Sequence, residues 1–185
     1  MSDNLNHDLA VTDYQPQRER MKKWAKAHYI DEFKIKGRLL DAGCGDGFWS
    51  SVFYEYGIDP TGIDPTRSSI EKGRRQWPHL DLRILSIEDA YKQDYKGWDI
   101  VFARGVSPFY KDQDKATELI DMLITMGDRV LLALYTHQNN EPNSHGHMMW
   151  SEDVFRGMID NAGGKVLKSV FIANFLQIEV VNALS

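Results

Sequence analysis

The chain has 185 residues, of which 42% are hydrophobic and 26% charged, and its formal net charge is −5 at pH 7. This composition predicts one ordinary globular domain and no membrane span, because no apolar run approaches the ~20 residues that a span needs. The acidic balance argues against a large nucleic-acid footprint, and the single cysteine, Cys44, together with a polar N-terminus, favours a cytoplasmic protein without disulfides.

Hydrophobic periodicity and turn residues predict helices and strands that alternate along the chain. The predicted helices cover residues 18–33, 48–56, 69–77, 114–126 and 152–162. The predicted strands cover residues 38–41, 61–64, 80–85, 98–103, 130–135, 166–172 and 176–181. Ser68 and Glu71 are the expected capping box of the third helix, Ser151 caps the last one, and Gly127-Asp128 is an expected turn.

Alternation at this spacing predicts an α/β fold, a doubly wound and mostly parallel seven-stranded sheet with helices on both faces. The last two strands are separated by a short turn at 173–175, so we expect a C-terminal antiparallel hairpin. Ligands of such sheets bind beyond the carboxyl ends of the strands. We therefore expect the segments 41–47, 64–65, 86–88 and 135–137, with Arg104, along one edge.

The stretch LLDAGCGDG, residues 39–47, places glycines at alternate positions directly after a strand. Glycines there let the backbone turn sharply and approach a ligand closely. Phe48 stands where the dinucleotide fingerprint has its last glycine, and Asp41 and Asp46 disfavour a diphosphate. Acids favour a cationic ligand, and Asp64, at the end of the second strand, suits a ribose diol. The loop thus predicts a nucleoside without a polyphosphate and with a positive charge.

These residues resemble a known family. The stretch 39–47, Gly62-Ile63-Asp64 and the strand start at 98–101 are similar to motifs of the class I, Rossmann-like S-adenosylmethionine-dependent methyltransferases. The resemblance implies the strand order 3-2-1-4-5-7-6 and a domain over residues 36–185 that binds the methyl donor. We expect the N-terminal segment 1–35, with Tyr14, Trp24 and Tyr29, to pack over the cofactor site.

The resemblance also implies residues for the donor site. Asp41 would lie near the donor's amino end, Asp64 would accept from the ribose hydroxyls, and Arg104 would border the sulfonium and the acceptor. The full expected donor set is Asp41, Ala42, Gly43, Cys44, Gly45, Asp64, Pro65, Ser86, Ile87, Glu88 and Arg104. Of these, residues 86–88 would contact adenine, with Ser86, Glu88 or Asp89 as the acceptor for its amino group. Alternatives stay open: Asp41 bracing the loop through backbone N–H groups, Asp64 capping a helix, and Cys44 as a packed side chain.

Methyl transfer from a sulfonium needs alignment, and it needs a general base only when the acceptor must lose a proton. We predict His137 and Arg104 as the catalytic candidates. The predicted acceptor pocket consists of Tyr110, Tyr135, His145, His147 and Asn174, and no metal is expected. Ser107–Tyr110 nearly matches an amino-methyltransferase motif, but three residues separate it from the preceding strand, so a turn is preferred.

The sequence therefore predicts a methyltransferase that uses S-adenosylmethionine, leaves S-adenosylhomocysteine and acts on an O or N atom of a small molecule. We expect no nucleic-acid partner and no membrane, and the oligomeric state is open. The alternatives are a methyltransferase acting on nucleic acid or protein, an NAD-type oxidoreductase, and a non-catalytic protein that binds the donor.

Overall fold

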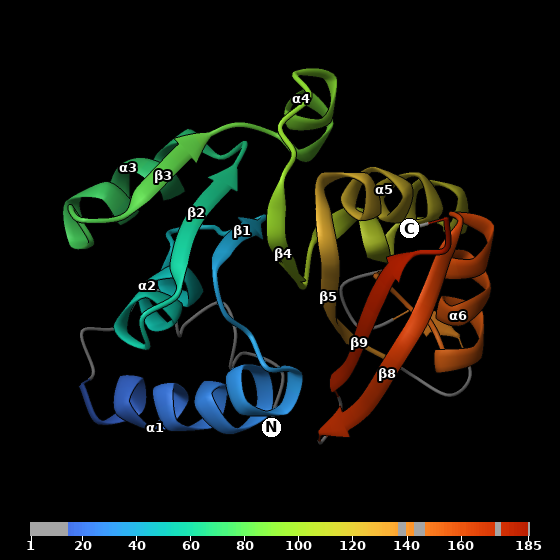
Figure 1. Cartoon of the computed structure of the whole chain (residues 1–185), viewed down its shortest axis with the longest axis horizontal. Helices are drawn as coiled ribbons and strands as arrows, with labels where there is room; N and C mark the ends of the chain where they lie inside the picture. Colours follow the sequence, from blue (N-terminus) through green and yellow to red (C-terminus); the bar gives the residue numbers. More distant parts are fainter. Residues whose placement is uncertain (1–14, 137–139, 143–146, 173–174, 185) are drawn as a thin grey trace.

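The computed structural model describes residues 15–136, 140–142, 147–172 and 175–184 (Figure 1). In chain order the elements are α1 (Gln15–Ala25), η1 (Lys26–Asp31), β1 (Arg38–Ala42), α2 (Phe48–Glu55), β2 (Asp59–Asp64), α3 (Arg67–Gln76), β3 (Asp81–Ile84), α4 (Ile87–Lys92), β4 (Trp98–Arg104), η2 (Ser107–Tyr110), α5 (Gln113–Met126), β5 (Gly127–Tyr135), β6 (Glu141–Pro142), β7 (Met148–Met149), α6 (Glu152–Asn161), β8 (Gly164–Ile172) and β9 (Phe175–Asn182).

The main sheet has seven strands in the order β3-β2-β1-β4-β5-β9-β8. The strands β1 to β5 pair in parallel, whereas β9 is antiparallel to both β5 and β8. The two-residue strands β6 and β7 pair with each other outside this sheet. With that small pair left aside, the predicted strand order and the C-terminal hairpin are confirmed.

The strand β5 has apolar side chains on both of its faces. Val130, Leu132 and Leu134 belong to one hydrophobic core, and Leu131 and Ala133 belong to the other. A strand that is covered on both faces has no solvent side, which explains why its sequence is an unbroken apolar run.

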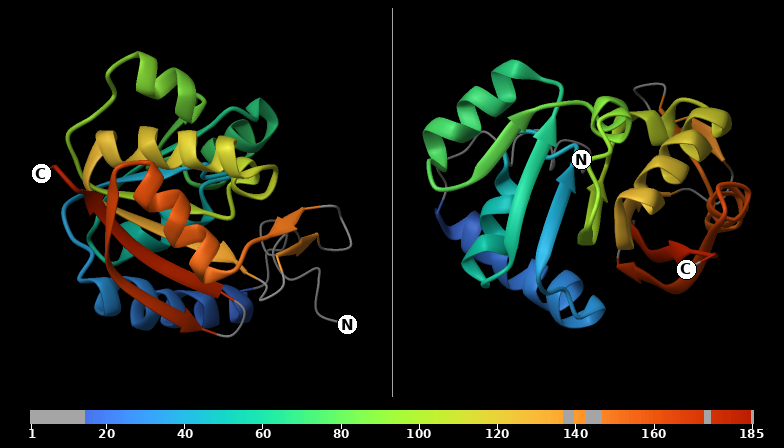
Figure 2. Two further views of the ribbon diagram at one scale, coloured as in Figure 1. Left: turned by 90° about the vertical axis from the view of Figure 1, so that its right-hand side faces the viewer. Right: turned by 45° about the horizontal axis from the view of Figure 1, so that its top comes forward.

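Helices cover both faces of the sheet. Buried residues of α4, α5 and α6 pack in one core, and those of η1 and α2 pack in the other. In the left view of Figure 2, α4 and α5 lie above the sheet and α1 lies below it. The helix α3 packs on β2 and β3 through a third cluster, which contains Ile70, Leu82 and Cys44. The predicted doubly wound arrangement is confirmed.

The N-terminal helical segment starts as α1 and continues as the wider π-helical turns of η1. Tyr29 in η1 is fully buried and packs edge-on against Phe102 of β4. On α1, both Arg18 and Lys22 form ion pairs with Glu55 of α2. The described part of this segment is therefore fixed to the face of the sheet that α2 covers.

Two local predictions are wrong. The helix α3 begins at Arg67 after the N-cap Thr66, so Ser68 and Glu71 are not its capping box. The Thr66 backbone N–H donates to Asp64 Oδ1 at 2.8 Å, and this bond starts the helix earlier. Gly127 is extended and opens β5 directly after α5, so the chain makes no separate turn there. The helix α4 was not predicted at all.

The helices of the described residues include none that is long and apolar enough to cross a membrane.

Candidate functional site

Four parallel strands end side by side along one edge of the sheet. The strand β1 ends at Ala42, β2 at Asp64, β4 at Arg104 and β5 at Tyr135. The registers Ala42↔Ile63 and Arg104↔Ala133 align these ends across the sheet. The structure therefore brings Asp41, Asp64, Arg104 and Tyr135 to one edge, as the sequence predicted for these residues.

The glycine loop leaves β1 through left-handed backbone conformations. Gly43 has φ +80° and Gly45 has φ +58°, a region that residues with side chains rarely occupy. The N–H groups of Gly43 and Cys44 both donate to the Ile63 carbonyl, at 2.9 and 3.0 Å. The N–H of Gly45 donates to Asp64 Oδ2 at 3.1 Å. The loop is thus fixed to the end of β2 by its own backbone.

The two glycines differ in what lies in front of them. A Cβ built on Gly43 would lie 2.9 Å from Val106 in the loop after β4, so that position is closed by packing. A Cβ built on Gly45 meets no atom within 4 Å. The face of the loop at Gly45 is open, and it lies next to the Asp64 carboxylate.

Asp41, near the end of β1, is almost entirely buried. Its Oδ2 accepts a hydrogen bond from Ser50 Oγ in α2 at 2.6 Å. Burial raises the pKa of Asp41 to about 7, and the Ser50 hydrogen bonds only partly oppose this. The carboxyl therefore joins β1 to Ser50 of α2, which is a different bond from the expected alternative of bracing by backbone N–H groups of the loop. The expected contact with the donor's amino group stays a prediction.

The sequence suggested that Asp46, the other acid of the loop, would favour a cationic ligand, but its carboxylate already has a partner within the protein. It forms an ion pair with Lys72 of α3, with 2.7 Å between Oδ2 and Nζ, and only 8% of its side chain is exposed. Its charge is balanced within the protein, so the argument for a cationic ligand rests on Asp41 and Asp64. Cys44 is buried, and its burial raises the pKa of the thiol, which fits a packed side chain and not a nucleophile.

Asp64 uses one oxygen for Gly45 and the other for Thr66. It thereby joins the glycine loop to the start of α3, next to the exposed Pro65. The alternative that Asp64 serves a helix start is thus observed in part, through the Thr66 N–H. Each carboxylate oxygen still has a second lone pair for a ligand donor.

The expected adenine-binding segment begins α4. Ser86 is the N-cap of this helix, and its Oγ accepts from the Asp89 N–H at 3.0 Å. Ile87 is buried and Glu88 is exposed. The Ser86 hydroxyl therefore has a local partner, which the sequence analysis did not foresee, and Glu88 is the exposed acid of this segment.

Arg104 lies at the end of β4 within a cluster of aromatic rings. Its guanidinium carbon is 4.5 Å from the ring centroid of Phe175 and 4.8 Å from that of Trp49. Its Nε donates to Tyr29 Oη at 3.1 Å. Sequence reasoning linked neither Phe175 nor Trp49 to Arg104, because nothing local in the sequence connects these residues. The aromatic density of the N-terminal segment did point to Tyr29.

Three predicted pocket residues lie close together. Tyr110 Oη accepts from the Tyr135 backbone N–H at 3.1 Å, and the ring of Tyr110 stacks with that of His147, with 6.0 Å between centroids. The ring of Tyr135 lies 3.9 Å from that of Phe175, next to Arg104. Burial raises the pKa of Tyr110 to about 12, so its hydroxyl stays protonated near neutral pH.

The remaining predictions of the site fall on residues that the structure does not describe: His137, His145, Asn174 and, on the N-terminal segment, Tyr14. Ser107–Tyr110, the alternative motif, forms one 3-10 turn, η2. Within the described ranges no cluster of three His, Cys, Asp or Glu side chains is suited to a metal ion.

The sequence profile of a family described as a methyltransferase domain matches residues 14–168. The chain belongs to this methyltransferase family, as its motifs predicted. A search of curated proteins found no match.

Several solved structures share the fold. The magnesium protoporphyrin IX methyltransferase from Synechocystis PCC 6803 with bound SAM is 17% identical, with a TM-score of 0.65 over 91% of this chain and 79% of that one. The mitomycin 7-O-methyltransferase is 17% identical, with a TM-score of 0.70 over 90% and 54%. The 1,6-didemethyltoxoflavin-N1-methyltransferase from Burkholderia thailandensis, with its acceptor and S-adenosylhomocysteine, is 14% identical, with a TM-score of 0.67 over 90% and 82%.

Proposed function

We propose that this protein transfers a methyl group from S-adenosylmethionine to an O or N atom of a small molecule. The observation that carries the proposal is the open face at Gly45 beside Asp64, at the end of the first strand of a methyltransferase fold. The alternative of an NAD-type oxidoreductase has no comparable support, because Phe48 stands where the dinucleotide fingerprint has its last glycine.

The residues at this opening fit the groups of the donor. The free space at Gly45 admits a ribose against bare backbone, and Asp64 has lone pairs left for the two ribose hydroxyls. Asp64 makes this end of the site acidic, as a ligand with an ammonium and a sulfonium requires, and Asp41 adds negative charge as the pH rises through its pKa of about 7. Val106, packed on Gly43, bounds the site on the side of β4.

The donor supplies an already activated methyl group, whose leaving group is a neutral thioether. The task of the chain is therefore to align the acceptor and to exclude water. Arg104 is itself a cation and would repel a sulfonium, so we assign it to the acceptor side of the site, where its guanidinium lies among Trp49, Phe175 and Tyr29. Tyr110, Tyr135 and His147 extend the acceptor side from Arg104.

A proton acceptor is required only when the acceptor is a hydroxyl or a protonated amine. Tyr110 is not suited to this role, since its pKa of about 12 keeps its proton in place. His137 remains the candidate base. The acceptor is proposed to be small because the three structures named above carry small acceptors in their names and because the chain is acidic overall.

Titration calorimetry with S-adenosylhomocysteine tests the donor half of the proposal. Asp64→Asn keeps the shape but loses the charge, and we expect binding to weaken about ten- to hundredfold, the range for hydrogen bonds to charged groups. Asp59→Asn, at the other end of β2, is the matched control and should bind normally. Absence of binding by the native protein would refute the function, and normal binding by Asp64→Asn would refute the ribose assignment.

Release of S-adenosylhomocysteine with a panel of phenols, amines and carboxylic acids tests the acceptor half. Turnover with a member of this panel supports the proposal. Turnover only with RNA, DNA or protein would show that the enzyme is a methyltransferase acting on nucleic acid or protein. Tight donor binding without turnover on any acceptor would identify a non-catalytic binder.

A further inference from the structure

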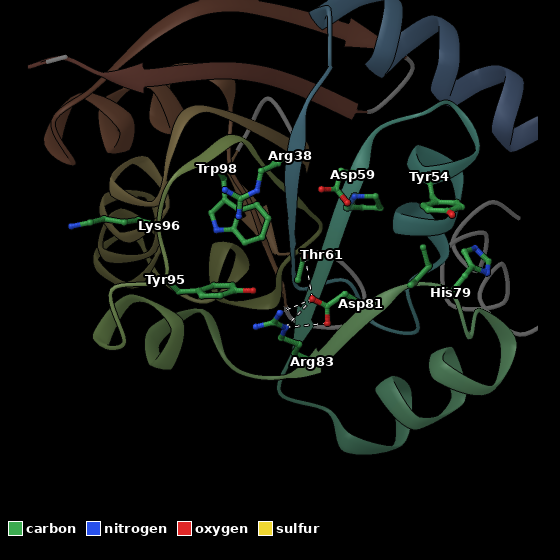
Figure 3. A pocket seen from close by; sticks show the side chains of 12 residues that line it. Arg38, Tyr54, Asp59, Thr61, His79, Asp81, Arg83, Tyr95, Lys96 and Trp98 are labelled. Carbon is green, nitrogen blue, oxygen red and sulfur yellow. Dashed lines mark hydrogen bonds and ion pairs between the residues drawn. The ribbon is translucent and has the colours of Figure 1, made fainter.

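A groove lies at the opposite edge of the sheet, where β1, β2, β3 and β4 begin (Figure 3). Its volume is about 390 Å³, which is within the range of small-molecule sites. The first residues of the four strands, Arg38, Asp59, Asp81 and Trp98, line it. The glycine loop stands at the far end of β1, roughly 15 Å away at about 3.3 Å per residue. The groove is therefore separate from the proposed donor site.

Aromatic side chains lie on two sides of the groove, with Asp59, Thr61, Asp81 and Arg83 between them. Figure 3 shows Arg38, Trp98 and Tyr95 on one side and Tyr54 and His79 on the other. The rings of Tyr54 and His79 contact each other, with 4.7 Å between centroids. Aromatic and guanidinium planes on both sides of a groove favour a planar ligand, which stacks on such surfaces.

Arg38 is one of the charged side chains of this groove, whose lining also includes the carboxylates of Asp59 and Asp81. Its guanidinium carbon lies 4.7 Å from the centroid of the Trp98 ring, and its Nη1 donates to the Gly97 carbonyl at 3.2 Å. Within the described part of the chain, the Arg38 guanidinium forms no ion pair. It is an oriented cation that retains N–H groups for an anion.

The other two cations of the groove already have carboxylate partners. Arg83 donates from Nε and Nη2 to Asp81, with distances of 2.6 to 3.1 Å, while its guanidinium lies over the Tyr95 ring. Lys96 pairs with Asp94 at 2.7 Å. Arg38 is therefore the group of this wall that an incoming anion would neutralise.

The same wall also contains an N–H group that is buried out of reach of a ligand in the groove. Trp98 is only 4% exposed, and its indole N–H has no acceptor among the residues that the structure describes. Buried N–H groups without a partner are uncommon in folded proteins. The Arg38 guanidinium, which has no ion-pair partner among the described residues, is therefore the group of this wall that a ligand in the groove can use.

We propose that this groove is a second binding site, which takes a small aromatic anion. The phosphate or carboxylate of the ligand lies on Arg38, and its aromatic ring lies between the Tyr95 side and the Tyr54–His79 side. The charge follows from Arg38, the flat shape from the aromatic walls, and the size from the volume of the cavity.

Phenyl phosphate is the simplest probe with both features. We expect it to bind the full chain in a calorimetric titration at saturating S-adenosylhomocysteine, which fills the donor site. Inorganic phosphate and phenol, which carry one feature each, should bind at least tenfold more weakly. No heat at millimolar phenyl phosphate would overturn the proposal, and so would equally tight binding of inorganic phosphate.

Arg38→Gln should weaken phenyl phosphate binding about tenfold or more, as the loss of a charge-assisted hydrogen bond does. Arg67→Gln, an exposed arginine of α3 outside the groove, is the matched control and should bind normally. If Arg38→Gln does not fold, Arg38→Lys keeps the charge without the planar fork, and an intermediate loss is expected. Native affinity in the folded Arg38 variant would overturn the proposal. Binding of S-adenosylhomocysteine, measured in the same samples, tests the proposed function separately.

Discussion

Asp41 shows how burial sets the protonation of a single carboxyl group. Its pKa is raised to about 7 in the folded chain, against an ordinary value near 4 in an unfolded one. The folded state therefore holds a proton that the unfolded state has lost between these two values. This contribution to stability is complete below about pH 4 and is lost as the pH rises to about 7.

We predict that Asp41→Asn removes this part of the pH dependence. The free energy of unfolding, measured by urea titration at pH 5 and at pH 7.5, should fall less with rising pH in the variant than in the native protein. The difference isolates Asp41 from the histidines, which titrate in both proteins. Parallel pH profiles of the two proteins would contradict the assigned pKa.

Gln177 is a polar residue that is buried in the apolar interior of the sheet. It is fully buried on β9, opposite Ala133 and Val170, and neither its amide nitrogen nor its amide oxygen has a partner in the described structure. We predict that Gln177→Met, of similar size, raises the free energy of unfolding by about 1–3 kcal/mol, because no buried polar group is then left unpaired.

Urea unfolding measures this change, and Gln177→Glu is the opposing control. A buried carboxylate in the same position should lower stability. A loss of stability in Gln177→Met would mean that the amide has a partner after all. Gln177 pairs with Ala133, which in turn pairs with Arg104 across the sheet. If Gln177→Met gains stability but loses turnover, we would infer that Gln177 contacts the methyl acceptor.

At the scale of elements, the approach of α3 to the glycine loop depends on one residue. A Cβ built on Gly73 would lie 2.4 Å from the Asp46 carbonyl oxygen, a backbone atom that cannot move alone. In α6, by contrast, a Cβ on Gly157 meets nothing within 4 Å. The same substitution is therefore expected to have opposite effects in the two helices.

We predict that Gly73→Ala lowers the free energy of unfolding by about 1–3 kcal/mol, the usual cost of overpacking. Gly157→Ala should raise it by about 0.5–1 kcal/mol, since alanine is the better helix former. Gly73→Ala should also weaken S-adenosylhomocysteine binding, because the clash displaces the loop. Equal effects in the two helices, measured by thermal unfolding, would show that α3 and the loop are not in this contact.

At the scale of the whole molecule, a ligand of the folded state must stabilise the entire domain. We predict that S-adenosylhomocysteine at about 100 times its Kd adds about 2.7 kcal/mol, which raises the melting temperature of a domain of this size by roughly 5–10 °C. NAD at the same concentration should cause no shift. Scanning calorimetry decides between them, and a shift with NAD alone would favour the oxidoreductase.

The sequence alone determined the order of the elements and the edge at which the site lies. Periodicity is a local property, so it located all the strands of the main sheet, and the parallel arrangement then placed Asp41, the glycines, Asp64 and Arg104 together. The motif of residues 39–47 indicated the family, because its glycines allow the left-handed backbone conformations that this loop adopts.

The tertiary structure decided which of these groups are free to act. Lys72 neutralises Asp46 from 26 positions away, and Tyr29 binds Arg104 from 75 positions away. The N-cap of α3 is Thr66 and not Ser68. The Thr66 N–H donates to the Asp64 carboxylate, a contact that the pattern of residue types does not show. Burial, charge balance and hydrogen-bond partners are made by residues distant in the chain, so no local pattern of residue types encodes them.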